Sequence, residues 1–272
     1  MDKNSQEAMA AQLTPPDAQS QPQKQGEIRH LPSPPFIKID GLYNFRDCGG
    51  YPIADRPDKI IRRGMLYRSA EPSKITTKGI SQLQELAVSR IFDLRSDFEI
   101  EDSTKKGWGK LRVWDQAVRV PAAIFTDDYT HRAGRDHNLR NLGIEGFVDY
   151  YRAIVDSATS ADNPLQPLRN ILSHLAADGP SEPEPILIHC SLGKDRTGVI
   201  CALILSLCGV EDSIIAHEYA LTALGIEDKI ASIIADIRPN GPGLSEQEKR
   251  LFGARYLNKY GALGGGGIWR YY

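Results

Sequence analysis

The stretch ILIHCSLGKDRTG, residues 186–198, decides how this chain folds. It opens with three consecutive apolar residues, which is typical of a short buried strand. A polar loop containing Gly193 follows, and the chain is then apolar on nearly all sides from Thr197 to Leu207, which predicts a buried helix. A strand, a tight loop and a buried helix in this order form one unit of a sheet covered by helices.

The loop of this unit has the features of an anion-binding site. A helix N-terminus presents free backbone N–H groups and the positive end of the helix dipole, and a loop wrapped in front of it adds further N–H groups. Cys190 lies at the base of this loop, where a thiolate is favoured and is placed to attack phosphorus. Arg196 can bind two phosphate oxygens with its planar guanidinium. The residues expected to cradle a phosphate are Ser191, Leu192, Gly193, Lys194, Asp195 and Arg196.

The other side chains near the loop suggest supporting roles. Thr197 can donate its hydroxyl to the Cys190 sulfur and help it to leave in a second step. Lys194 adds a cation at the wall of the pocket, and Asp195 can either assist proton transfer or pair with a neighbouring cation. His189 is interpreted as orienting the loop by hydrogen bonding rather than as a base.

The pattern Cys-x5-Arg followed by Thr-Gly resembles the signature loop of the protein tyrosine phosphatase superfamily. The string HCSLGKDRTG is similar to that of the atypical tyrosine/serine phosphatases of bacteria and fungi, the cyanobacterial-type and mycobacterial secreted enzymes. Three stretches match that family's order: 44–47, 66–70, and 93–96 with Glu99. The resemblance covers about residues 40 to 260. It implies hydrolysis through a phosphocysteine intermediate at Cys190, without a metal or cofactor.

Two sets of residues around the loop have more than one possible role, the candidate general acids and the charged residues that surround the loop. The leaving oxygen needs a proton, normally from an aspartate on a mobile loop. The resemblance places such a loop at Asp127 and Asp128, with Asp195 as the alternative and no dedicated acid as a third reading. We interpret four further residues as buried ion-pair residues that brace the loop, with direct phosphate contact by either arginine as the alternative: Arg46, Asp47, Asp93 and Arg95.

The resemblance also bears on the substrate. It favours protein phosphotyrosine, together with phosphoserine or phosphothreonine. Lys194 favours a phosphoinositide or inositol phosphate, because a similar lysine occurs in phosphoinositide phosphatases. A phospho-binding pseudophosphatase is a further alternative, but the presence of both Cys190 and Arg196 argues against it.

Outward from the loop, strand-like runs alternate with helical patterns. Strands are predicted over 59–62, 65–67, 90–94 and 112–120, and helices over 76–87, 143–157, 165–178, 211–222, 227–237 and 245–258. Residues 122–142 are interpreted as a charged loop, and Tyr150 and Tyr151 as core residues. This order predicts an α/β fold with a mainly parallel central sheet flanked by helices, and the resemblance implies that it is tyrosine-phosphatase-like.

The rest of the chain limits the class of protein. Residues 1–34, rich in Gln, Pro, Ala and Ser, are predicted to be a disordered tail, 35–262 a phosphatase domain and 263–272 a Gly-rich tail. The net charge of -2 gives no reason to expect nucleic acid as a partner, and no apolar run is long enough for a transmembrane segment. Four sparse cysteines and the lack of an apolar secretory signal indicate the cytoplasm or nucleus. Among them, Cys48 is interpreted as a packing residue, with disulfide formation to an oxidised Cys190 as the alternative.

Overall fold

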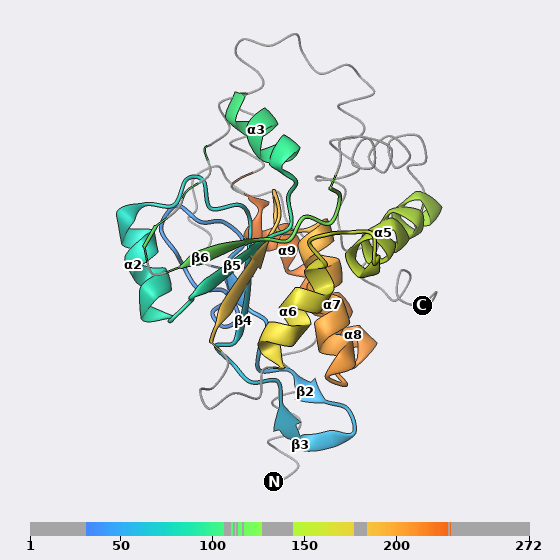
Figure 1. Ribbon diagram of the computed structural model, residues 1–272. Coiled ribbons are helices and arrows are strands. Elements are labelled where there is room, and N and C mark those ends of the chain that lie inside the picture. Colours follow the sequence, from blue (N-terminus) through green and yellow to red (C-terminus); the bar gives the residue numbers. More distant parts are fainter. Residues whose placement is uncertain are drawn as a thin grey trace, which may run out of the picture. The chain divides into compact units, whose positions relative to one another are not determined.

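The computed structural model of the chain describes residues 31–105, 110, 112, 114–115, 117–126, 144–176, 184–227 and 229. A five-stranded sheet with the order β1-β4-β7-β5-β6 lies at its centre (Figure 1). The strands are β1 (Arg46–Asp47), β4 (Leu66–Ser69), β5 (Arg90–Asp93), β6 (Val118–Pro121) and β7 (Ile186–His189). The last four run parallel to one another and β1 runs antiparallel to β4, so the predicted mainly parallel sheet is confirmed.

Strand β7 is the middle strand, and its register brings several strand ends to one edge of the sheet. His189 pairs with Ser69 on one side and with Asp93 on the other. The loop that begins at Cys190 therefore starts where three parallel strands end. Ligands of open α/β sheets bind at this carboxyl edge.

Helices cover both faces of the sheet, as predicted (Figure 1). Alternate side chains of β7 face opposite sides. Ile186 and Ile188 belong to the core shared with α5 (Ile144–Thr159), α6 (Pro167–Leu175) and α7 (Asp195–Leu207). Leu187 belongs to the other core, together with Leu83 of α2 (Thr77–Glu85). Helix α2 begins as expected, because the Thr76 hydroxyl accepts a hydrogen bond from the Gly79 backbone N–H at 3.1 Å.

Several elements differ from the sequence-based expectations. The strand predicted at 59–62 lies instead in β3 (Arg56–Ile60), which forms a separate two-stranded sheet with β2 (Pro52–Ile53). The helix predicted at 211–222 is two helices, α8 (Asp212–Ala220) and α9 (Thr222–Gly225), and α3 (Asp97–Lys105) was not predicted. Except for Glu227 and Lys229, the predicted helix 227–237 lies outside the described residues, as do the predicted helix 245–258, residues 127–142 of the predicted loop and both chain ends. Among the described residues, no helix has the length and apolar character needed to cross a bilayer.

Candidate active site

Cys190 lies directly after β7 and is buried, with 4% of its surface exposed. Residues 191–194 form the loop, and α7 begins at Asp195. Gly193 has a φ of +64°, and a Cβ atom built on it would lie 2.0 Å from the Ser69 carbonyl oxygen. Only glycine fits this left-handed turn against β4, so the predicted tight turn has a clear steric cause.

The carbonyl groups of the loop are held from outside by two buried side chains. Asn44 Nδ2 donates to the carbonyl oxygens of Leu192 and Gly193, at 3.0 and 3.2 Å. Arg68 Nη2 donates to the carbonyl oxygens of Gly193 and Lys194, at 2.7 and 3.4 Å. The C=O and N–H of one trans peptide point in opposite directions. The N–H groups of these peptides therefore face the inside of the loop, which is the arrangement of an anion-binding nest.

Arg196 is fixed by a buried carboxylate. Its Nη1 and Nη2 donate to the two oxygens of Glu99 at 2.6 and 2.7 Å, and Nη1 also reaches the Leu94 carbonyl at 3.3 Å. The Ser191 hydroxyl lies 3.5 Å from Nη2, so the guanidinium is beside the loop. Burial alone would lower the pKa of Arg196, but the Glu99 carboxylate raises it well above its ordinary value. The guanidinium is permanently charged and its orientation is set by α3.

The Lys194 side chain, which the sequence led us to expect as a cation at the pocket wall, is buried. Its side chain is 3% exposed, and its ammonium donates to Asp195 Oδ1 at 2.7 Å and lies above the rings of Phe147 and Tyr219. The hydroxyls of Tyr151 and Tyr219 contact each other and donate to the same Asp195 oxygen at 3.2 and 3.1 Å. The expected cation at the pocket wall is thus held against aromatic rings of α5 and α8. Tyr151 is a core residue, as interpreted, but its hydroxyl also belongs to this cluster.

Two predicted hydrogen bonds of the loop have different outcomes. Among the described residues, Thr197 Oγ1 is buried without any hydrogen-bond partner, so the expected bond to the Cys190 sulfur is not formed. His189 Nδ1 lies 3.2 Å from the Cys190 carbonyl oxygen, a contact that suits an orienting role. Burial lowers the pKa of His189, which keeps the imidazole neutral near pH 7.

The residues predicted to brace the loop have different roles in the structure. Arg95 donates with two nitrogens to the Asp93 carboxylate, each at 2.9 Å, and Arg119 donates to the same carboxylate at 3.1 Å. Although burial alone would raise it, His189 and these guanidinium groups hold the pKa of Asp93 well below its ordinary value. Arg95 is thus a buried ion-pair residue. Asp47 is different: it accepts backbone N–H groups, from Gly49 at 2.7 Å and Gly64 at 2.8 Å. It therefore holds a turn before β4, and among the described residues it forms no ion pair that braces the loop.

Arg46 is also buried in an ion pair. Its Nε donates to Glu218 Oε1 at 2.7 Å, and its other nitrogens donate to Asn44 and Thr222. With its three nitrogens engaged in this way, Arg46 braces neighbouring residues and does not face a phosphate. From the sequence alone, Asn44, Arg68 and Glu99 were noted only as matches to the family's order and Tyr151 only as a core residue. Glu218 and Tyr219 were not singled out. Ile215 and Glu218 are three positions apart on α8 and therefore share one face of the helix, and a carboxylate on a buried face requires a cationic partner.

The other proposed residues do not join the loop. Asp127 and Asp128 lie outside the described residues. The Cys48 backbone N–H donates to the Leu66 carbonyl at 2.8 Å, and Leu66 pairs with Ile186. Cys190 lies just beyond the end of β7, four residues after Ile186, which is about 13 Å at strand spacing and beyond the reach of a disulfide. A hydrogen bond with Cys201, together with burial, raises the pKa of Cys48, in line with the packing interpretation.

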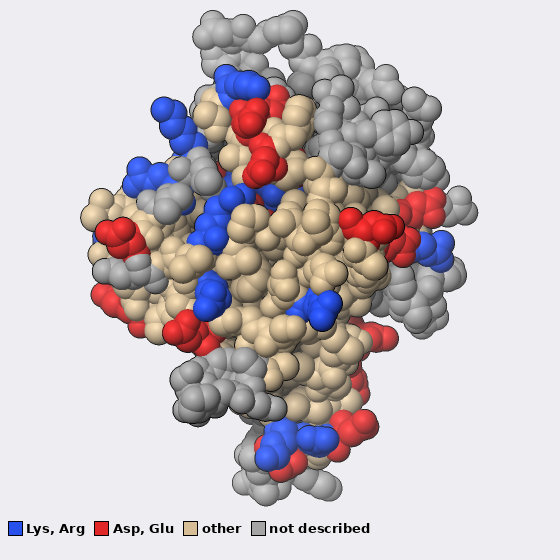
Figure 2. Space-filling model, in the orientation of Figure 1, with Lys and Arg blue, Asp and Glu red and all other residues tan. Residues whose placement is uncertain are grey.

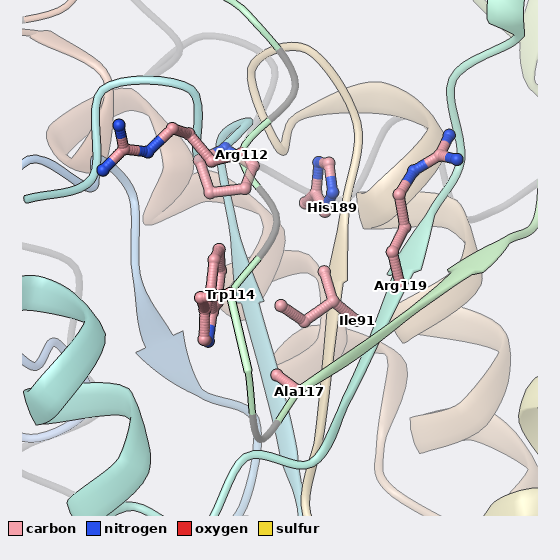
Figure 3. A pocket seen from close by; sticks show the side chains of 7 residues that line it. Ile91, Arg112, Trp114, Ala117, Arg119 and His189 are labelled. Atoms are coloured by element: carbon pink, nitrogen blue, oxygen red, sulfur yellow. The ribbon is translucent and has the colours of Figure 1, made fainter.

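A narrow pocket lies next to His189, at the end of β7. Its walls are formed by Pro72, Ile91, Arg112, Trp114, Ala117, Arg119 and His189. Figure 3 shows the guanidinium groups of Arg112 and Arg119 pointing to opposite sides, away from the space between Trp114, Ile91 and His189. The two cations do not converge, so this pocket lacks the arrangement of a second phosphate site. On the face shown in Figure 2, basic side chains gather between α3 and β6, while acidic ones lie over α3 and α5.

Comparison with known proteins provides evidence that is independent of the geometry of the site. The model of a family described as "Tyrosine phosphatase family" matches residues 37–258. The chain is 28% identical over 199 residues to "Triple specificity protein phosphatase PtpB" of Mycobacterium tuberculosis, covering 67% of each protein. It is 26% identical over 185 residues to a protein of Cupriavidus necator provisionally named a tyrosine-protein phosphatase, covering 66% of this chain and 61% of the relative. These alignments span about two thirds of each relative's length. A crystal structure of P. aeruginosa TpbA in complex with pTyr shares 18% identity over 84% of this chain and 99% of that one, but its TM-score of 0.29 is too low to bear on the fold.

Proposed function

The chain belongs to the tyrosine phosphatase family, and from that premise we propose that it hydrolyses phosphate monoesters with Cys190 as nucleophile. The observation that supports this most directly is the loop itself. Its carbonyl groups are bound from outside by Asn44 and Arg68, and Glu99 holds the Arg196 guanidinium beside it. A thiolate at the base of such a loop faces both the backbone N–H groups and a fixed cation, which is what phosphoryl transfer requires.

The proposed reaction has two steps. The Cys190 sulfur attacks phosphorus, an S–P bond forms, and the P–O bond to the leaving group breaks. Water then attacks the phosphocysteine, the S–P bond breaks, and inorganic phosphate is released with the thiolate restored. The inward N–H groups of the loop and Arg196 stabilise the charge on the equatorial oxygens in both steps. We assign to the buried hydroxyl of Thr197 the donation of a hydrogen bond to the departing sulfur, because an unpaired buried hydroxyl is costly.

The proton for the leaving oxygen is assigned to Asp127 or Asp128. Asp195 suits this role less well, because Lys194 and two tyrosine hydroxyls donate to its Oδ1. Donors of this kind favour the carboxylate over the protonated acid. We therefore place Asp195 among the residues that fix the first turn of α7.

The proposed substrate is protein phosphotyrosine, with phosphoserine and phosphothreonine as further candidates. The tyrosine phosphatase family and the name of the M. tuberculosis relative support this choice. The argument for a phosphoinositide rests on Lys194 as a cation at the pocket wall, similar to a lysine of phosphoinositide phosphatases, and its ammonium is paired with Asp195. We therefore place phosphoinositides behind phosphoproteins.

The test is turnover of an aryl phosphate, with a metal chelator present, by the wild type, Cys190→Ser and Cys208→Ser. We expect activity without metal that Cys190→Ser abolishes and Cys208→Ser retains, because Cys208 is exposed at the end of α7. Trapping of a phosphorylated enzyme at Cys190, detected by mass spectrometry, identifies the intermediate. Activity that survives in Cys190→Ser, or that requires a metal ion, contradicts the proposal. A panel of phosphotyrosine, phosphoserine and phosphothreonine peptides and inositol phosphates then ranks the substrates.

A further inference from the structure

We propose that Glu218 is a positioning residue which, through Arg46 and Arg68, sets the shape of the Cys190 loop. The inference rests on the proposed function, because it concerns how the same loop binds phosphate. Glu218 lies on α8 and is 1% exposed, and both arginines are fully buried. Its carboxylate binds one guanidinium with each oxygen, Arg46 Nε at 2.7 Å and Arg68 Nη1 at 2.5 Å.

Two routes lead from Glu218 to the loop. Arg68 reaches it directly, because Nη1 is on Glu218 while Nη2 donates to the Gly193 carbonyl at 2.7 Å. Arg46 reaches it through Asn44: Arg46 Nη1 donates to Asn44 Oδ1, which leaves Asn44 Nδ2 to donate to the loop. Both routes end at loop carbonyl groups, and the direction of each carbonyl fixes the direction of the N–H on the same peptide.

The network also places charge under the loop. Two guanidinium groups and one carboxylate leave one net positive charge in this buried set, next to the loop backbone. Thr222 closes the set, since its hydroxyl accepts from Arg46 Nη2 at 2.9 Å and from Arg68 Nη2 at 3.4 Å. Such a network can act by geometry, by charge, or only by holding the fold together, and these three roles predict different results.

Two variants separate geometry from charge. Glu218→Gln removes a negative charge, so a purely electrostatic role predicts tighter anion binding. Arg68→Lys keeps the positive charge but has one nitrogen in place of the two that bind Glu218 and Gly193 separately, so the planar guanidinium that joins them is lost. An electrostatic role predicts no change in this variant. A positioning role predicts that each variant weakens vanadate binding about tenfold and lowers kcat, because charge-assisted hydrogen bonds that shape the loop are lost.

The measurement is the vanadate affinity of the folded protein by isothermal titration calorimetry, with thermal unfolding recorded for each variant. Glu211→Gln, on an exposed residue that precedes α8, is the matched control and is expected to bind vanadate like the wild type. Unchanged vanadate affinity in folded Glu218→Gln, with a lower unfolding temperature, means a structural role only and overturns the proposal. Tighter binding in that variant overturns it in favour of charge.

Asn44→Gly provides a second test that leaves the buried ion pairs in place. Asn44 has a φ of 58°, so glycine suits its backbone while the two side-chain hydrogen bonds to the loop are removed. We expect weaker vanadate binding in a folded protein, and wild-type affinity here also overturns the proposal. Vanadate binding needs no turnover, so an inactive wild type whose affinity responds to Asn44→Gly contradicts the proposed function alone.

Discussion

At the residue scale, the position of Arg196 is set by one carboxylate. Glu99 binds both terminal nitrogens of the guanidinium, and both side chains are buried. A long arginine side chain loses conformational entropy when it is fixed in one orientation. In this protein the group that fixes it is the Glu99 carboxylate. The orientation of the phosphate clamp therefore depends on a residue of α3 that does not belong to the loop.

This arrangement predicts the effect of Glu99→Gln. The amide keeps the size of the side chain but loses the charged, bidentate partner, so Arg196 is expected to be less well oriented. We expect kcat/KM for an aryl phosphate to fall about ten- to a hundredfold, the range for loss of a hydrogen bond to a charged group. Glu101→Gln on the same helix is the control, because Glu101 is 68% exposed and pairs only with Lys105 among the described partners. Equal activity of the two variants contradicts the assignment of Glu99.

At the element scale, α7 and α8 approach closely at Gly198. A Cβ atom built at this position would lie 2.6 Å from two ring atoms of Tyr219. We expect Gly198→Ala to destabilise the protein by about 1–3 kcal/mol through overpacking, although alanine is the better helix former. Urea unfolding measures the change, with Ser206→Ala at an exposed site of α7 as the control. A Gly198→Ala protein as stable as the control contradicts this close packing.

The elements also show what the sequence could and could not predict. The β7–loop–α7 unit was predicted because its apolar strand, its glycine and its apolar helix are contiguous signals. Strand β1 has two residues and α3 begins Asp-Phe-Glu, so neither carries a clear apolar period. The roles of Asn44 and Glu218 depend on contacts across 149 and 172 residues of sequence, which no local pattern contains.

At the scale of the whole molecule, the buried His189 links folding to pH. Burial lowers the pKa of its imidazole; Asp93 acts in the opposite direction and Arg95 in the same direction. The unfolded chain therefore binds a proton at higher pH than the folded one does. Stability from this residue is present above the unfolded pKa of about 6.5 and is lost as the pH falls toward the folded pKa.

We therefore expect His189→Asn to reduce the loss of stability on acidification. The free energy of unfolding in urea, measured between about pH 5 and pH 7, is expected to fall less steeply in this variant than in the wild type. If the slope is the same in the wild type and in this variant, the buried imidazole is not the source of the pH dependence.

The outward hydrogen bonds of the loop have a consequence for the thermodynamics of binding. Because side chains of the fold fix the carbonyl groups of residues 192–194, the conformational entropy of this segment is lost when the chain folds. A small anion that binds there does not have to order the loop itself, so that cost does not oppose its association. The affinity of the loop for an anion therefore depends on hydrogen bonds that form when the chain folds. Substitutions of the side chains that hold the loop carbonyl groups change the free protein as much as they change the complex.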